Sequence, residues 1–322
     1  MIFNRFSQIL AISGCSLSMG FFVYNREFFD KVVIWKTISI ENQKTTFCND
    51  YLRKLLIQVG TDMNIPRETL ENIVIYYNSV NCPLFNGTIN ELSTPFFTIN
   101  CKSIPCIGLP IFFKHKYFND CTYDKLVLDG KVIDVEADSP EGVEFRSQML
   151  LTEDAKKFAL ARQLYYLQSN IDLIKAGGKI VAAYLAYQVS FIFYRFSKLS
   201  TLKPAYTALP FIGVIWLSAY TLQKHVIEAY SDSIHYAADE AAGNLGTRYH
   251  SGGIEFYSKV IKYNRIMHRW GFTSKFNKIG NDVYPKLFRY SYVNSYTRIG
   301  KMLNLFETDN QHYPDLNSYP RD

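Results

Sequence analysis

The sequence lacks the short motifs that usually accompany catalysis or phosphate binding. It contains no G-x-x-x-x-G-K-[ST], no G-x-G-x-x-G and no G-x-S-x-G motif. Its six histidines form no H-x-x-x-H pair, so no single helix carries a zinc site. We therefore expect no catalytic residue, no metal site and no cofactor, and we predict that the protein is not an enzyme.

Paired cysteines are also missing. The six cysteines form no C-x-x-C pair, and a free cysteine behaves as a small hydrophobic residue, so most are interpreted as buried thiols. A disulfide among Cys82, Cys101, Cys106 and Cys121 stays open if this region faces an oxidising compartment. The sequence does not choose between these states.

A strong excess of one charge is absent as well. The net charge is +6 and is spread along the chain. Residues 259–301 are basic, with Asp282 as their only acidic residue, but the cations are scattered among apolar residues. A nucleic-acid-binding protein would gather its cations on one face. We therefore expect no nucleic acid partner, and take the lipid bilayer with its negatively charged surface as the simpler partner.

Apolar residues are abundant, and they gather in stretches without charge. The chain is 48% hydrophobic and 16% aromatic, and it has uncharged stretches at 6–25, 180–194 and 204–223. This placement favours a membrane protein. The first stretch, between Arg5 and Arg26, fits either a retained anchor or a mitochondrial targeting segment.

The two later stretches predict a transmembrane hairpin with a short basic connection that contains Arg195, Lys198 and Lys203. The alternative is a pair of buried helices in a soluble core. A soluble helix normally has a polar stripe, and residues 204–223 have none, so the hairpin is favoured.

The remaining segments predict an α+β arrangement. Short strands are expected at 72–77, 96–100, 107–113 and 125–135, and they would form a small sheet. A helix should begin after Thr152, a suitable N-cap residue. Residues 228–267 are expected to be helical, with a break at Gly252-Gly253.

The predicted fold is thus an α+β membrane protein, with a small sheet plus helices and a central two-helix transmembrane hairpin. Its expected parts are an N-terminal anchor or targeting segment at 1–27, a soluble α+β region at 28–151, an amphipathic helix at 152–178, the hairpin at 179–224, a helical region packing with the soluble region at 225–308, and a disordered tail at 309–322.

The order of these parts is that of membrane-bound zinc metallopeptidases, which carry His-Glu-x-x-His before the hairpin and Glu-x-x-x-Asp after it. The corresponding positions here are Arg162, Gln163 and Tyr166, then His235 and Asp239. A permanently cationic Arg opposes metal binding, and a Gln cannot accept a proton from water. We interpret these five positions as a degenerate peptidase-like scaffold, or pseudo-peptidase. An ordinary amphipathic helix and a membrane-embedded metallopeptidase with atypical ligands are the alternatives.

Small residues recur on the first hairpin segment, where they would permit close helix approach. The candidate helix-packing residues are Gly177, Gly178, Ala182, Ala183 and Ala186. They could contact a partner helix or the second helix of the same hairpin. The sequence leaves both possibilities open.

Three segments resemble the transmembrane protein 177 family. They are Glu153–Ser169, with its Ala-Lys-Lys-Phe-Ala-Leu-Ala-Arg run, Gly252–Lys259 and, more weakly, Gly280–Arg289. The resemblance covers about 151–303, while the region before it matches in layout more than in letters.

The resemblance implies a multi-pass protein of the mitochondrial inner membrane that acts in biogenesis of cytochrome c oxidase. It also implies two partners, namely the assembly chaperone of oxidase subunit II and subunit II itself, whose stability the family supports. The family offers no catalytic residues to transfer. This chain departs from it in a longer tail rich in Asn and Tyr.

Overall fold

A computed structural model of the chain describes residues 50–78, 106–118, 125–128, 131–134, 138–169, 171–196, 209–271, 277–280 and 295–309, with the isolated residues 9, 12, 13 and 16. Several predictions concern residues outside this set: the strand at 96–100, the tail after Asp309 and all cysteines except Cys106. The predicted anchor at 1–27 includes only the four isolated residues. The anchor, this strand, the disordered tail and the state of these cysteines stay predictions.

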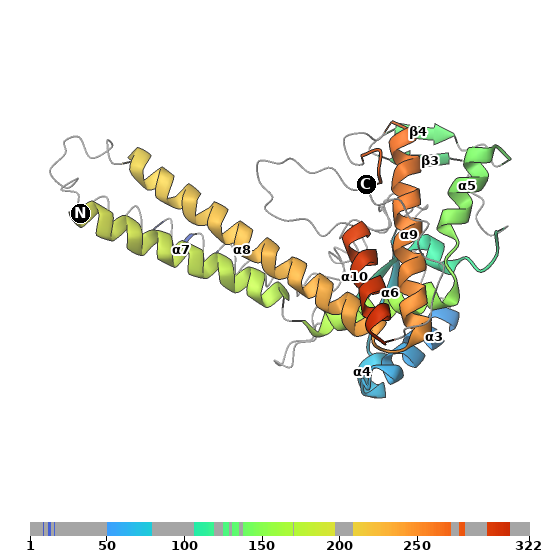
Figure 1. Cartoon of the computed structure of the whole chain (residues 1–322). Helices are drawn as coiled ribbons and strands as arrows, with labels where there is room; N and C mark the ends of the chain where they lie inside the picture. Colours follow the sequence, from blue (N-terminus) through green and yellow to red (C-terminus); the bar gives the residue numbers. More distant parts are fainter. Residues whose placement is uncertain are drawn as a thin grey trace.

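The described chain has two regions, a helical body and a long two-helix arm that projects from it (Figure 1). The arm consists of α7 (Ile171–Phe196) and most of α8 (Leu209–Gly243), whose last turns enter the body. The body contains α3 (Asp50–Asp62), α4 (Arg67–Glu71), α5 (Pro140–Met149), α6 (Glu153–Gln168), α9 (Thr247–Arg269), α10 (Ser295–Asp309) and a 3₁₀ turn, η1 (Ile111–Lys114).

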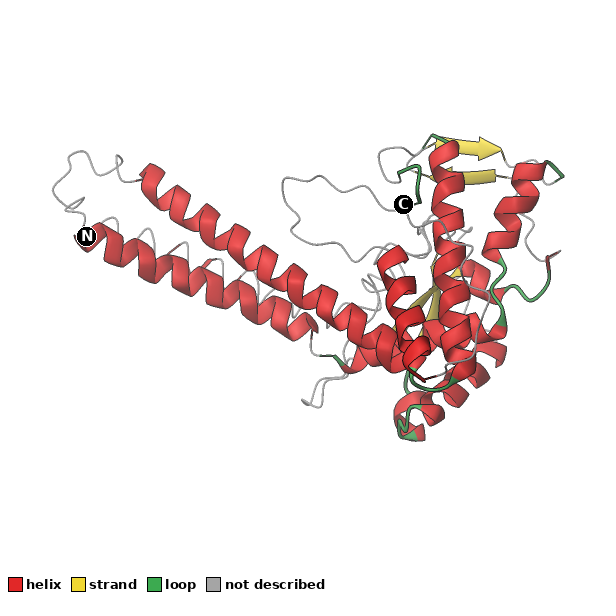
Figure 2. Cartoon of the chain, viewed as in Figure 1, coloured by secondary structure: helices red, strands yellow, loops and turns green. Residues whose placement is uncertain are grey.

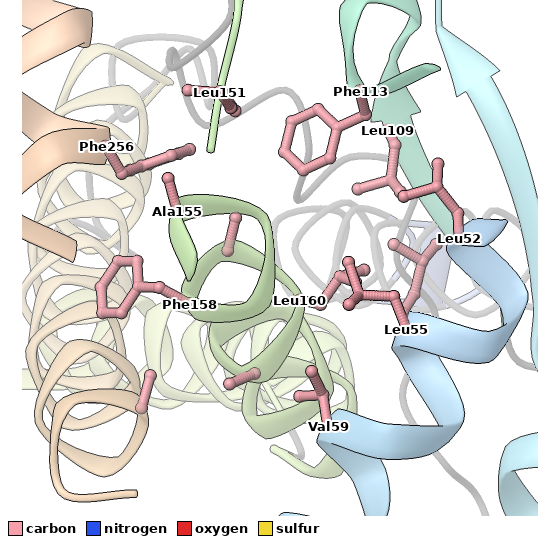
Figure 3. Packing of buried hydrophobic residues seen from close by; sticks show 14 of the residues in the cluster. Leu52, Leu55, Val59, Leu109, Phe113, Leu151, Ala155, Phe158, Leu160 and Phe256 are labelled. Carbon is pink, nitrogen blue, oxygen red and sulfur yellow. The ribbon is translucent and has the colours of Figure 1, made fainter. Parts of the chain in front are cut away.

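Helix α6 is the centre of the body. It begins where the Thr152 side chain accepts a hydrogen bond from the Ala155 amide, and Glu153 and Asp154 lie in its first turn, next to the positive end of the helix dipole. It is buried on nearly every side, as expected for a helix surrounded by others. Figure 3 shows α6 between two layers, with Phe158 directed toward α9 and Leu160 toward α3.

Helix α9 crosses α6 at very close range because two glycines lie at the crossing. A Cβ on Gly252 would lie 2.3 Å from the Asp154 carbonyl oxygen, and one on Gly253 would lie 2.8 Å from the Phe158 ring. The expected helix break at Gly252-Gly253 is therefore wrong, since both residues lie inside α9. The chain breaks earlier, between Gly243 and Thr247, where Gly246 has a φ of 141°.

Strands are few in the described residues, and they do not form one sheet. β1 (Val74–Asn78) pairs in parallel with β2 (Cys106–Pro110), and β3 (Lys125–Leu128) pairs antiparallel with β4 (Lys131–Asp134). Figure 2 shows these strands as short elements beside the helices of the body. The predicted α+β fold with a small sheet is wrong. Each strand has four or five residues and one partner, and the core is built mainly by helices packing on α6.

The arm is an antiparallel pair of helices, but the predicted transmembrane hairpin needs correction. Within the described residues, no helix combines the length and the apolar character required to cross a membrane. The reason lies in the local sequence. The uncharged part of α7, between Lys179 and Arg195, covers about 15 residues, whereas a spanning helix needs roughly 20.

Candidate functional site

The main polar feature of the described chain is buried where the base of the arm enters the body. Arg162 comes from α6, His235 and Asp239 from α8, Tyr257 from α9 and Arg298 from α10. We call these five residues the charged cluster. It lies at the crossing of four helices, so its geometry depends on the whole body.

Arg162 joins α6 to α8 through two contacts. Its Nε donates to Asp239 Oδ1 at 2.7 Å, and its Nη2 lies 2.9 Å from His235 Nδ1. A guanidinium can only donate hydrogen bonds, so His235 Nδ1 accepts and the imidazole proton resides on Nε2. Both partners of the ion pair are buried, with side-chain exposures of 8% and 6%. A pair this deep is costly to break.

Tyr257 and Arg298 complete the cluster on the other side of Asp239. The Tyr257 hydroxyl donates to Asp239 Oδ1 at 2.6 Å, and it accepts from Arg298 Nη1 at 2.9 Å. Arg298 Nε also lies 3.6 Å from Asp239 Oδ2. Burial raises the pKa of Tyr257 to about 12, and Asp239 acts in the same direction, while the two arginines oppose the rise. One carboxylate thus lies between two guanidinium groups.

The structure brings four of the five peptidase-like positions together. Arg162, His235 and Asp239 are in direct contact, and the Tyr166 ring stacks on His235 with centroids 5.2 Å apart. The fifth position, Gln163, is buried in α6, and its Oε1 accepts no hydrogen bond within the described residues. Their proximity follows from the crossing of α6 and α8, and it does not establish a peptidase-like scaffold.

Sequence reasoning missed Tyr257 and Arg298. Tyr257 lies in the Gly252–Lys259 segment that carries the resemblance, which was an available signal. Arg298 lies in the scattered basic tail, where nothing in the sequence distinguishes it from its neighbours. Its role depends on the docking of α10, which is held by a 2.6 Å contact between His250 Nε2 and the Met302 carbonyl oxygen.

Chemically, the charged cluster holds helices together. The described residues contain no group of three or more His, Cys, Asp or Glu side chains placed to hold a metal ion. At the position where the peptidase layout would have a metal ligand, Arg162 supplies a positive charge. The Arg162 guanidinium neutralises the charge of Asp239 and donates a hydrogen bond to Nδ1 of His235.

The candidate helix-packing residues do not all face the same way. A Cβ on Gly178 would lie 3.1 Å from Ile227 of α8, and Ala186 is buried, so these two residues face the partner helix of the hairpin. Ala182 and Ala183 are partly buried, whereas a Cβ on Gly177 would meet nothing within 4 Å.

The second candidate site is the outer surface of the arm, where many large apolar side chains are exposed. Near its tip, the rings of Phe193 and Phe211 join α7 to α8 at 6.0 Å. We define the apolar surface of the arm as the exposed residues Val181, Tyr184, Leu185, Val189, Ile192, Phe193, Phe196, Phe211, Val214, Leu217, Tyr220 and Leu222. Soluble monomers rarely expose apolar patches larger than a few hundred Å².

The fold defines a helical protein with a two-helix arm whose outer surface is apolar. The family comparison adds the class of protein. Residues 99–283 match the family model described as Transmembrane protein 177, and the chain belongs to this family. The family is one of membrane proteins, as its name states.

Individual relatives are similar at low identity. The chain is 22% identical to Transmembrane protein 177 of Rattus norvegicus over 317 residues, which cover 94% of this chain and 93% of the relative. It is 23% identical to that of Homo sapiens over 74% of this chain and 76% of the relative. The match to the Xenopus laevis protein is 28% identical but spans 44% of this chain and 45% of the relative. No solved structure matches the chain.

Proposed function

We propose that this protein is a non-enzymatic factor in the biogenesis of cytochrome c oxidase at the mitochondrial inner membrane. It would be a multi-pass protein there, and would bind the assembly chaperone of oxidase subunit II and subunit II itself. Family membership supports the proposal. The observation that carries it is the apolar surface of the arm, attached to a body in which the Arg162–Asp239 ion pair is buried.

The apolar surface of the arm needs a cover, because a water-exposed apolar surface of this extent is unfavourable. Lipid acyl chains and the apolar helices of partner proteins both provide one. The face of α7 that carries Gly178 and Ala186 packs against α8, so it is not available to a partner. Partner contacts therefore belong to the outer face, which includes Leu185 on α7 and Val214 and Leu217 on α8.

A binding role rather than catalysis fits the charged cluster. Asp239 accepts hydrogen bonds from Arg162 and Tyr257, and His235 accepts from Arg162. A general base needs a free lone pair directed at a substrate or water. Asp239 Oδ1 and His235 Nδ1 are engaged by donors from neighbouring helices, and Asp239 Oδ2 lies 3.6 Å from Arg298 Nε, so these contacts position α8, and with it the arm, on the body.

The partner proposal is tested by affinity purification of the tagged full chain from mitochondria. Replacing Leu185, Val214 and Leu217 together by alanine keeps the arm apolar but removes the side chains that pack into a partner. We expect copurification of subunit II and its chaperone to fall at least about tenfold. Val143→Ala, on the exposed surface of α5 in the body, is the matched control and should leave copurification unchanged.

Equal recovery of both partners with the triple variant and the wild-type chain would contradict the proposed binding surface. The location is tested separately by fractionation and by protease treatment of mitochondria with intact and ruptured outer membranes. Recovery of the chain outside mitochondria would overturn the proposed location whatever the outcome of the purification.

A further inference from the structure

Two sides of α7 differ in burial although both flank the stripe that faces α8. Gly178 and Ala186 belong to that stripe. The two flanking sides are each displaced from Ala186 by roughly 100° around the helix, in opposite directions. The sheltered side consists of the partly buried residues Ile180, Ala183, Tyr187 and Phe191. The open side consists of Val181, Leu185, Val189 and Ile192, which are all at least 50% exposed.

The contact with α8 does not account for this difference. A partner helix that lies over Ala186 shields the two flanking sides of α7 to a similar extent, because they are displaced from it by similar angles. The rings of Tyr187 and Phe191 stack on the sheltered side with centroids 6.5 Å apart, and they provide an apolar packing surface. The difference in burial indicates that a further segment of the chain lies against the sheltered side.

The sequence contains one segment suited to this position. Residues 6–25, which we call the N-terminal segment, carry no charge. As a helix they would be about 30 Å long, which exceeds the roughly 17 Å between Ile180 and Phe191 on α7. Burial of an unpaired charge against an apolar helix is costly. The other stretches of ten or more residues outside the described ranges all contain charges; they are 26–49, 79–105, 197–208, 281–294 and 310–322.

The described residues of the N-terminal segment agree with a helix that has one exposed face. Ile9, Ile12, Ser13 and Ser16 are helical and exposed. Their spacing places them on the same face of a helix. Ser18 follows Ile9 by two and a half helical turns and therefore belongs to the opposite face. That opposite face is the one available for packing.

The connection to the body is long enough for this placement. Residues 26–49 lead from the N-terminal segment to Asp50, where α3 begins. A fully extended chain of this length reaches roughly 80 Å. Helix α7 has 26 residues, so it is only about 39 Å long. The N-terminal segment can therefore lie at any level of the arm.

We propose that the N-terminal segment is a third helix of the arm and packs along the sheltered side of α7. The open side of α7 stays accessible to partners from outside the chain. This packing is independent of the proposed partners and location. It also makes residues 6–25 part of the mature fold, and not a targeting segment that is removed.

Photocrosslinking of the full chain in living cells provides the test. Phe191→benzoylphenylalanine places the reactive ketone on the sheltered side, and Leu185→benzoylphenylalanine is the matched control on the open side. Trypsin cuts after Arg5 and Arg26 and so releases the N-terminal segment as one peptide, 6–26. Because the ketone reacts only with atoms in contact, we expect at least about tenfold more crosslinking of this peptide from 191 than from 185. The crosslinked protein should have the size of a monomer.

A second pair of variants tests which face of the N-terminal segment packs against α7. Ser18→Trp adds a bulky ring to the proposed packing face, whereas Ser16→Trp adds the same ring to the exposed face. Overpacking should separate the two helices, so we expect Ser18→Trp to lower the crosslinking from 191 about tenfold. Ser16→Trp should leave it unchanged.

Three results would overturn the proposal. They are equal crosslinking of peptide 6–26 from 191 and 185, its absence from the crosslinks of 191, and a crosslinked species of dimer size. Loss of residues 6–25 from the mature chain would overturn it as well. Equal effects of Ser18→Trp and Ser16→Trp would contradict the assigned packing face.

Discussion

The body buries its large apolar side chains, whereas the arm exposes many of them. In the body, Phe158 and Leu160 on α6 are fully buried between α9 and α3 (Figure 3). In the arm, Leu185 and Leu217 have exposures of 54% and 63%. The body therefore has its own core, whereas the described residues leave the outer face of the arm without a cover. Substitutions in the two regions should have very different effects on stability.

Glycines show the same difference. Gly252 in the body lies where a Cβ would meet backbone, but Gly177 and Gly213 on the arm have open space around the Cβ position. The body uses glycine to bring helices together. On the outer face of the arm, the same residue type meets no neighbour within the described chain.

The largest expected effect is on the charged cluster of the body. Asp239→Asn removes the carboxylate between Arg162 and Arg298 and leaves two buried cations without a counter-charge. We expect a loss of about 3–5 kcal/mol in the free energy of unfolding, measured by urea titration in mild detergent. Glu144→Gln breaks the exposed contact with Arg269 and should cost at most about 1 kcal/mol. Equal losses in the two variants would contradict this account of the cluster.

A second variant concerns the Tyr257 hydroxyl, which donates to the Asp239 carboxylate. Tyr257→Phe should cost about 1.5–3 kcal/mol at neutral pH, because the carboxylate loses a buried hydrogen bond. The pKa of Tyr257 is raised from 10 to about 12, so the folded protein holds this proton more tightly than the unfolded chain. The stabilisation is complete below pH 10 and is lost as the pH rises toward 12.

The measurement for Tyr257 is the difference in unfolding free energy between the wild-type chain and Tyr257→Phe across this pH range. The difference should shrink from pH 10 to pH 12. A difference that stays constant over the same interval would show that the hydroxyl is not a buried acid in the folded protein.

A third pair of variants compares glycines in the two regions. Gly252→Ala places a methyl group 2.3 Å from the Asp154 carbonyl oxygen and should destabilise the body by about 1–3 kcal/mol. Gly177→Ala meets no atom within 4 Å and should be neutral or stabilising by up to about 1 kcal/mol, because alanine favours helix. Thermal unfolding followed by circular dichroism reports both, and a reversed order of the two would contradict the placement of these helices.

The smallest effect on stability is expected on the outer face of the arm. Leu217→Ala in detergent should change the free energy of unfolding by no more than about 0.5 kcal/mol, since the side chain is exposed. Leu160→Ala in the body should cost about 2–5 kcal/mol. A large loss for Leu217→Ala would mean that another part of this chain covers the arm.

Some features of the fold could be predicted from local sequence. Thr152, a suitable N-cap residue, indicated the start of α6, and the strands expected at 72–77, 107–113 and 125–135 overlap β1, β2, β3 and β4. Others could not. Gly252-Gly253 indicates a break by local rules, but the close crossing of α6 overrides that preference and requires glycine inside α9.

The candidate site was predictable only where a known layout supplied the positions. The zinc-metallopeptidase layout pointed to Arg162, Tyr166, His235 and Asp239, among other positions. These four residues lie together because α6 crosses α8. Arg298 follows Tyr257 by 41 residues, and their contact exists only once α10 has docked. No local pattern contains that information. The expected strands at 72–77, 107–113 and 125–135 overlap β1, β2, β3 and β4, but these form two separate pairs instead of one sheet, and strand pairing depends on the whole fold.

The most direct test of the central claim is the accessibility of the arm in native mitochondria. Leu217→Cys and Val143→Cys place thiols at exposed positions of the arm and the body, and mass spectrometry quantifies labelling of each peptide by a water-soluble maleimide after the membranes are opened. We predict that the thiol at 217 stays protected until detergent is added, while the thiol at 143 reacts at once. Equal labelling of both positions before detergent would show that nothing covers the arm and would contradict the account.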